Sequence, residues 1–257
     1  MTEDFAGRIQ DYLRLSAQRA REVIPVPPFV VTIDPSTDLR YLNYAIPTGR
    51  GAAASGAAAI DSLQEEMRNR GRLPRLEFVA EANEGLDSVL LAGGFEVESS
   101  LPLMTCSPQQ LTRAPAVDGL RVEALSPSSP DALLSGVSAA QQEAFGESAG
   151  GSDPGLQRER LARGTISVAA IVDDQVVGGA SATVVSDGLT EVAGVGVREP
   201  FRGRGIAAAL TEAATREAFA AGADLALLTP GHPEAQRIYE RAGFAGRLTM
   251  LAYAAPS

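Results

Sequence analysis

The chain has few of the residues that most often carry metal, redox or triad chemistry. Its 257 residues include no tryptophan, one cysteine (Cys106) and one histidine (His232). One cysteine forms no intrachain disulfide and builds no cysteine-ligated zinc site, and one histidine argues against His-based catalytic triads and ordinary zinc sites. We therefore expect no metal, and we expect any chemistry to come from tyrosine, carboxylates, backbone amides or bound water.

Long hydrophobic runs are missing as well. No apolar stretch approaches the roughly 20 residues that cross a membrane, and no basic segment followed by an apolar one opens the sequence. The formal net charge of −10 argues against a nucleic-acid partner. We therefore expect a cytoplasmic protein without membrane or nucleic-acid partners. With 45% hydrophobic residues, the chain has enough apolar material for one large or two small domains.

A strand, a tight turn and a helix start follow one another in residues 194–207. Val195 and Val197 alternate as in a strand. Gly203 and Gly205 then permit a tight turn, because glycine adopts backbone conformations that other residues avoid. Several backbone N–H groups can converge on one point in such a turn.

The helix that follows is expected to begin at Ile206. Its first N–H groups are unpaired and carry partial positive charge, and Arg202 and Arg204 add two formal charges. The segment therefore predicts a binding site for an anion such as a pyrophosphate; the alternative is a surface turn with two incidental arginines. The P-loop pattern and the third glycine of a dinucleotide fingerprint are both absent from the sequence.

A second segment lies about 20 residues further along. Residues 225–229 are a short apolar run suited to a buried strand. Residues 233–244 predict a short helix, with Pro233 in its first turn and Gly243 where a C-terminal cap belongs.

Together, the two segments resemble the cofactor motifs of the GNAT superfamily of N-acetyltransferases. Those motifs run Arg/Gln-x-x-Gly-x-Gly/Ala and Asn-x-x-Ala-x-x-x-Tyr-Glu-x-x-Gly-Phe, and His232 stands where the asparagine usually is. The residues of this chain that match are Arg202, Gly205, Ala207, Ala235, Tyr239, Gly243 and Phe244.

The resemblance implies acetyl-CoA as co-substrate and acetyl transfer to the primary amine of a small molecule or peptide. The cofactor-binding residues that it implies are Val195, Gly196, Val197, Arg202, Gly203, Arg204, Gly205, Ile206, Ala207 and His232. For His232 the alternative is a helix cap. For Gly194 and Gly196 the choice is between close approach of a pantetheine arm and a β-bulge or loose packing. Backbone N–H groups at 195–197 would polarise the thioester carbonyl.

Tyr239 is the candidate general acid for the departing CoA thiolate, or else a core residue of its helix. Glu191 is the candidate general base, directly or through water, if strict alternation places it on one strand face with Val195; the alternative is an exposed charged group. Asp187, Glu143 and Glu147 are weaker candidates for the base.

Residues 76–95 and 225–244 have the same length from a strand start to a Gly-Phe ending, which indicates an internal duplication. In the first copy Leu90 falls opposite Tyr239, and the turn lacks the paired arginines. We expect an α/β (α+β) protein of tandem GNAT architecture, each domain a mixed, mostly antiparallel sheet flanked by helices. The predicted domains are 1–112, degenerate, and 119–257, catalytic, with a linker at 113–118.

The pattern along the chain predicts a first helix over residues 5–23 and, among the later elements, a loop over 146–155. The resemblance to the GNAT superfamily implies that loops such as this one determine the acceptor. Two alternatives stay open for the function. One is a non-catalytic acyl-CoA binding or sensing module, and the other is a transferase for a different acyl group. The identity of the acceptor and the oligomeric state are not encoded in any pattern we recognise.

Overall fold

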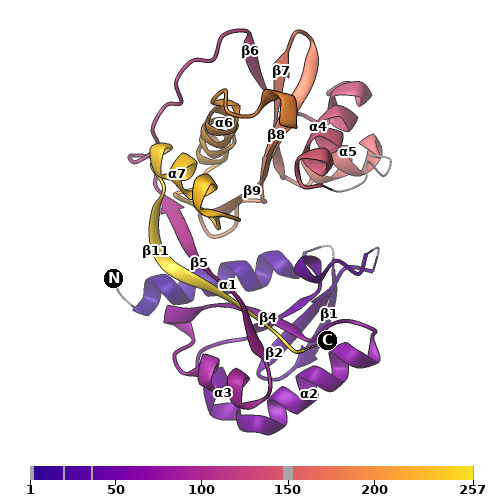
Figure 1. Cartoon of the computed structure of the whole chain (residues 1–257), viewed down its shortest axis with the longest axis vertical. Helices are drawn as coiled ribbons and strands as arrows, with labels where there is room; N and C mark the ends of the chain where they lie inside the picture. Colours follow the sequence, from indigo (N-terminus) through magenta and orange to yellow (C-terminus); the bar gives the residue numbers. More distant parts are fainter. Residues whose placement is uncertain (1–2, 20, 36, 147–152, 257) are drawn as a thin grey trace. The chain divides into compact units, whose positions relative to one another are not determined.

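The chain folds into two compact units, seen in a computed structural model that describes residues 3–19, 21–35, 37–146 and 153–256 (Figure 1). The first unit comprises Met1–Leu103 and Gly246–Ser257, and the second comprises Met104–Ala245. Within the described ranges there are seven α-helices, and most strand pairs are antiparallel. The expected α/β class is confirmed. No described helix is both long and apolar enough to cross a membrane.

The first unit is a six-stranded sheet, within the described residues, with helices on both faces. In the order in which they pair, its strands are β1 (Glu22–Val26), β2 (Phe29–Ile33), β3 (Tyr44–Pro47), β4 (Arg75–Val79), β11 (Ala245–Ala254) and the first part of β5 (Glu96–Cys106). Its helices are α1 (Glu3–Ala17), α2 (Gly56–Asn69) and α3 (Leu86–Ala92). From β1 to β11 in this order, β3 and β4 are parallel and the other neighbouring pairs are antiparallel.

One face of this sheet is apolar. Phe29 and Val31 of β2 share a buried core with Ile60 and Leu63 of α2. Side chains alternate between the faces of a strand, so Val30 points the other way, where it packs with Ala17 of α1. The two helices therefore cover opposite faces of the sheet.

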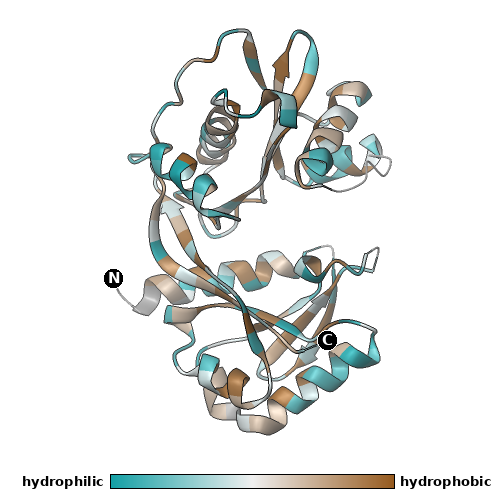
Figure 2. Cartoon of the chain, in the orientation of Figure 1, coloured by the Kyte–Doolittle hydropathy of each residue, from teal (hydrophilic) through white to brown (hydrophobic). Residues whose placement is uncertain are grey.

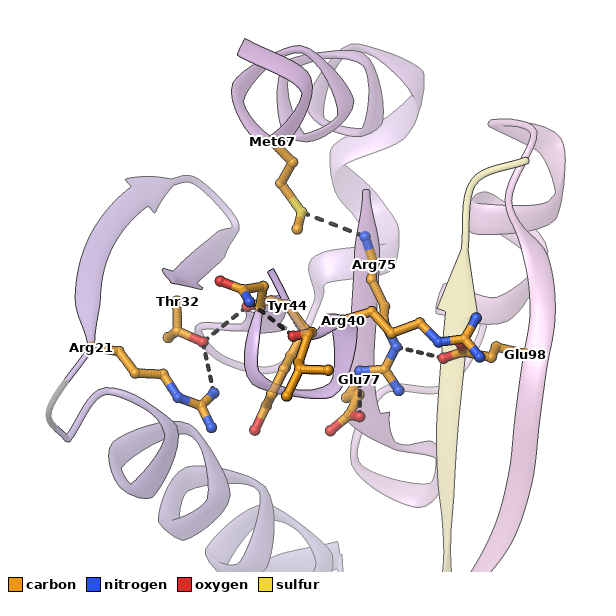
Figure 3. Close-up of polar contacts among 10 residues, drawn as sticks. Arg21, Thr32, Arg40, Tyr44, Met67, Arg75, Glu77 and Glu98 are labelled. Carbon is orange, nitrogen blue, oxygen red and sulfur yellow. Dashed lines mark hydrogen bonds and ion pairs between the residues drawn. The ribbon is translucent and has the colours of Figure 1, made fainter. Parts of the chain in front are cut away.

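The face on the α1 side also carries a cluster of charged residues (Figure 3). Arg75 forms ion pairs with Glu77 and Glu98, each at 2.5 Å. The guanidinium groups of Arg21 and Arg75 lie 4.9 and 5.7 Å from the centre of the Tyr44 ring. Burial raises the pKa of Glu77, and the charge of Arg75 opposes that rise. Charges are tolerated on this partly buried face because each has an opposite charge or an aromatic ring beside it.

The first helix is shorter than the expected 5–23. It ends at Ala17, and residues from Glu22 onward form β1, which pairs with β2 as an antiparallel hairpin. Two features favour this outcome: Val23 and Ile24 are β-branched, and Pro25 cannot continue a helix.

The second unit is a sheet in which β9 and β10 are parallel neighbours and the other pairs are antiparallel. In the order in which they pair, its strands are the end of β5 (Glu96–Cys106), β10 (Leu225–Leu228), β9 (Leu189–Val197), β8 (Gln175–Ala182), β7 (Ile166–Val172) and β6 (Leu120–Ala124). Its helices are α4 (Asp131–Ala144), α5 (Pro154–Ala162), α6 (Ile206–Ala220) and α7 (Pro233–Arg241).

Two adjacent glycines of β8 let helices approach closely on both faces of this sheet. A Cβ atom on Gly178 would lie 3.1 Å from Leu210 of α6, and one on Gly179 would lie 2.6 Å from Val137 of α4. Because neighbouring residues of a strand face opposite ways, α6 and α4 cover opposite faces. Figure 2 shows the strands between them as largely hydrophobic and α7 as largely hydrophilic.

The two units share one order of elements. A strand, a 3-10 turn, a helix, a parallel strand and a short helix follow one another in β3–α3 and again in β9–α7. The closing helices also end alike: Phe95 N–H donates to the carbonyl oxygen of Leu90, and Phe244 N–H donates to that of Tyr239, each at 3.0 Å. Gly94 and Gly243 both have positive φ (82° and 99°). The structure thus has the duplicated order that the sequence alignment predicts.

The boundaries of the units differ from the predicted 1–112, 113–118 and 119–257. Residues 250–254 of β11 pair with β4 of the first unit. Residues 104–106 of β5 pair with β10 of the second unit, and Thr112 N–H donates to Ala242 at 3.0 Å. The pairing of strands that are distant in sequence therefore places the unit boundaries after Leu103 and after Ala245, and not at the predicted linker 113–118.

We expect a fragment of residues 119–257 to be insoluble or unfolded. It lacks Met104 and Cys106, both fully buried beside β10, and it keeps β11 without its partner β4. An unpaired strand edge and an uncovered apolar face both promote aggregation. A fragment of residues 104–245 retains the whole second unit and serves as the control, with circular dichroism and sedimentation as measurements. A folded, monomeric 119–257 fragment would show that the strand from residues 104–106 is dispensable.

Candidate functional site

The turn between β9 and α6 has the geometry of an anion site. After β9 come a 3-10 turn (Glu199–Phe201) and then Gly203 and Gly205, with φ of 74° and 86°. Gly205 is the N-cap of α6, and no side chain caps the helix there. The first N–H groups of α6 therefore remain available to an anion at the positive end of the helix dipole.

A cavity of about 690 Å³ opens beside this turn. Most of the residues that we predicted for the cofactor line it: Val195, Gly196, Val197, Arg202, Gly203, Gly205, Ile206, Ala207 and His232. Tyr239, the candidate acid, lines it too, whereas Arg204 and Glu191 are outside its lining. Strand β9, the turn and helix α7 are thus brought together around one space.

Arg202 is already engaged with protein carbonyl groups. Its Nε donates to the carbonyl oxygen of Val197 at 3.0 Å, and one terminal nitrogen donates to that of Ala144 at 3.1 Å. Ala144 is the last residue of α4, where the helix dipole favours a cation. Arg202 therefore links the turn to α4 in addition to placing positive charge at the cavity.

Arg204 points elsewhere in this structure. Its guanidinium lies 5.6 Å from the centre of the Phe201 ring, and the residue is exposed. Arg204 lies between the two glycines of the turn in the sequence, but its side chain does not line the cavity.

Strand β9 contains a β-bulge, one of the two alternatives for its glycines. Ser181 pairs with Ala193 and Gly179 pairs with Gly196, so one residue of β8 faces two residues of β9. Gly194 lies in the bulge with φ of 63°. The bulge breaks the strict alternation that aligned Glu191 with Val195.

Gly196 allows β9 to pack closely against α4, because glycine has no side chain. A Cβ atom there would lie 2.9 Å from the Cβ atom of Ala144. Even alanine at this position would push α4 away from the cavity wall.

Tyr239 combines the two roles between which the sequence left a choice. Its ring packs against the main core of the second unit and lies 6.4 Å, edge to face, from the ring of Phe244. The same residue lines the cavity. Burial raises the pKa of the Tyr239 phenol above its ordinary value of 10.0. A phenol is protonated at neutral pH already at its ordinary pKa, and the upward shift extends this proton-donating form to more alkaline pH.

His232 is a helix cap that also lines the cavity. The backbone N–H of Ala235 donates to its Nδ1 at 3.2 Å, so the ring nitrogen does what an asparagine oxygen would do at an N-cap. Two of the other acidic candidates, Glu143 and Asp187, are not among the residues that line the cavity. Glu143 forms an ion pair with Arg198 at 3.1 Å, and Asp187 lies in the turn between β8 and β9. Glu147, and most of the expected acceptor loop 146–155, lie outside the described residues.

The sequence analysis missed the contribution of α4 to this site. Ala144 and Phe145 line the cavity, and Phe145 is 59% exposed. No local pattern identifies them, because α4 is about 50 residues distant in sequence. Ile238 and Arg241 of α7 also line the cavity. They follow Ala235 at intervals of three residues, a spacing that places residues on one face of a helix, so the sequence could have identified them. In the described part of the chain, no cluster of acidic, histidine or cysteine residues suited to a metal ion occurs.

Comparison with known proteins assigns this site to a family. The profile of the acetyltransferase (GNAT) family matches residues 135–244, which lie entirely within the second unit. The second unit contains a GNAT acetyltransferase domain. Members of this superfamily use acetyl-CoA as co-substrate, so the GNAT fold supports acyl-CoA-dependent acetyl transfer as the general chemistry of this protein.

Solved structures extend the likeness beyond the matched segment. A GCN5-related N-acetyltransferase from Kribbella flavida is 28% identical, with a TM-score of 0.83 over 98% of this chain and 96% of that one. One from Sphaerobacter thermophilus is 18% identical, with a TM-score of 0.63 over 88% and 80% of the two chains. A tandem GNAT protein from the clavulanic acid biosynthesis pathway is 13% identical, with a TM-score of 0.58 over 100% and 97%. The last two show likeness of fold alone. Among curated proteins, none matches this chain.

Proposed function

We propose that the second unit transfers an acetyl group from acetyl-CoA to the primary amine of a small molecule or peptide by direct attack. The observation that carries this proposal is the cavity itself, where the glycine turn at the start of α6, the bulged strand β9 and Tyr239 meet. In this proposal the turn holds the pyrophosphate through N–H groups of α6, and the pantetheine arm runs toward Val195 and Tyr239.

The reaction needs three proton transfers. The ammonium loses one proton before the amine nitrogen attacks the thioester carbonyl carbon, the carbon–sulfur bond breaks, and the departing thiolate takes a proton from Tyr239. The attacking nitrogen loses its second proton as the amide forms, and that proton returns through water to the Tyr239 phenolate. Backbone N–H groups at 195–197 stabilise the oxyanion that forms in between. Glu191 is half-buried on β9 and outside the cavity lining, so we propose that a bound water carries the ammonium proton toward it.

Release of the free CoA thiol from acetyl-CoA, measured with a panel of primary amines, tests the proposal. We expect thiol release that depends on the amine and a product heavier than the amine by one acetyl group. CoA binding without amine-dependent release would instead favour an acyl-CoA binding or sensing module. Release with a longer acyl-CoA but not with acetyl-CoA would favour a different acyl donor.

We further propose that the architecture is tandem, with a first unit that has lost its cofactor site. Residues 52–56, from its 3-10 turn to the start of α2, contain no arginine, whereas the corresponding stretch of the second unit has Arg202 and Arg204. Ala52 is 2% exposed in the same core as Leu86 and Leu90. Leu90, which is fully buried, takes the place of Tyr239. Core packing between the turn and α3 thus fills the region that the second unit leaves open around its own turn.

We therefore expect one CoA per chain. Calorimetric titration of the full chain measures this stoichiometry. Gly205→Val should abolish the binding, because the substitution alters the turn of the second unit, where we place the single site. Two CoA molecules per wild-type chain, falling to one in Gly205→Val, would contradict the loss of the first site.

A further inference from the structure

The bulge in β9 is held by one side chain from another element. Nε2 of Gln141, on the last turn of α4, donates a hydrogen bond to the carbonyl oxygen of Gly194 at 2.7 Å. The two residues are 53 positions apart in the sequence. This contact joins the helix that ends at the cavity to the strand that lines it.

The bulge needs such a partner. The ladder between β8 and β9 offers Ala180 alone opposite both Gly194 and Val195, so the extra residue has no place in regular pairing. A backbone carbonyl without a partner in a partly buried position costs free energy, and the Gln141 amide supplies the missing donor.

The Gln141 side chain is also fixed in place by its surroundings. Its Cδ lies 3.5 Å from where a Cβ atom of Gly179 would stand, and its Cα lies 3.2 Å from the corresponding point on Gly196. Nε2 lies 2.7 Å from the Cβ point of Gly194, so any larger residue at position 194 would displace it. Three glycines on two strands thus leave room for this one glutamine.

We propose that Gln141 is a positioning residue for acetyl transfer. By holding the Gly194 carbonyl it fixes the direction of the peptide units that follow, at Val195 and Gly196, both of which line the cavity. Their N–H groups then face the thioester carbonyl, where a small displacement removes most of the stabilisation of an oxyanion. This inference rests on the proposed acetyltransferase function.

The test is Gln141→Met, which keeps the length of the side chain and removes its donor. We expect kcat to fall about 10- to 100-fold, the range for a slightly misplaced oxyanion donor. The dissociation constant for CoA should change less than about twofold, which corresponds to about 0.4 kcal/mol, because the phosphate turn and α6 are untouched. We expect the wild type to bind acetyl-CoA more tightly than CoA through the contact with the acetyl carbonyl, and we expect this difference to disappear in Gln141→Met.

Gln142→Met is the matched control, because Gln142 is the next residue of α4 and, within the described part of the chain, its buried Oε1 has no hydrogen-bond partner in the bulge or elsewhere. It should leave kcat and both dissociation constants as in the wild type. Gln141→Glu, with the same shape but no amide donor, should repeat the loss seen in Gln141→Met. Unchanged CoA binding by these variants also shows that they are folded.

Two results would overturn the role of Gln141. One is a wild-type kcat in Gln141→Met, and the other is a parallel loss of kcat and CoA affinity, which would indicate a structural role alone. If the wild type transfers no acetyl group to any amine, the proposed function fails, and the dissociation constants for CoA and acetyl-CoA still test the role of Gln141. Tighter binding of acetyl-CoA than of CoA that is lost in Gln141→Met supports the role of Gln141 in positioning the N–H groups. Equal affinities of the wild type for the two ligands contradict that role.

Discussion

Gly205→Val should weaken CoA binding by about 100-fold or more, the largest effect on affinity that we expect from one substitution. Gly205 has a φ of 86°, a conformation that costs an L-residue about 1–2 kcal/mol and a β-branched residue more. A Cβ atom there would also lie 3.3 Å from Val117. The valine would shift the turn and place a side chain where N–H groups must reach the pyrophosphate. Isothermal titration calorimetry with CoA measures the change.

Gly222→Val is the control for backbone strain. Gly222 follows the other end of α6, has a φ of 98° and has open space around its Cβ position. Its valine variant should lose a comparable amount of stability in thermal unfolding and bind CoA normally. If Gly205→Val binds CoA as tightly as the wild type, the glycine turn is not the phosphate site.

Tyr239→Phe should reduce turnover by roughly 10²- to 10⁴-fold, the range for loss of a general acid, with little change in CoA affinity. The substitution keeps the ring that packs on the core and against Phe244, and it removes only the hydroxyl. Single-turnover and steady-state acetyl transfer measure the effect. Tyr253→Phe is the matched control, because Tyr253 is a buried tyrosine of the first unit, stacked on Phe78.

The pH dependence gives a second readout for Tyr239. Burial raises its pKa, so the protonated, donating form persists up to and beyond the ordinary value of 10.0. We therefore expect no loss of turnover that is due to this residue between about pH 7 and pH 10. An alkaline decline with a midpoint well below pH 10 that vanishes in Tyr239→Phe would contradict the raised pKa. Normal turnover in Tyr239→Phe would leave Tyr239 as a core residue only.

The sequence predicted most of the local structure around the cavity. The strand ending at Val197, the turn at residues 202–205 and the helix from Ile206 all occur where the pattern places them. These features depend on residues a few positions apart: alternation of apolar residues, glycines where φ is positive, and an open helix N-terminus. The prediction of a duplication rested on the same local signals, repeated once.

The bulge at Gly194 could not be derived in this way. A glycine in a strand is compatible with regular pairing and with a bulge, and the outcome depends on the register that β8 adopts on both sides of it. The expected alignment of Glu191 with Val195 assumed regular alternation, and it failed at the bulge. Likewise, the pattern shows that Arg202 is near the turn, but not that carbonyl oxygens of β9 and α4 occupy two of its donors.

By itself, the sequence determined the class of fold, the order of the elements and the residues of the glycine turn, because neighbours in the chain fix these. The tertiary structure alone decided which distant segments complete the site and the units. It brought the end of α4 and Gln141 to β9, across 53 residues, and it paired β11 with β4. The physical reason is that strand pairing and helix packing are chosen by the fit of whole surfaces, and no short stretch of sequence contains both surfaces.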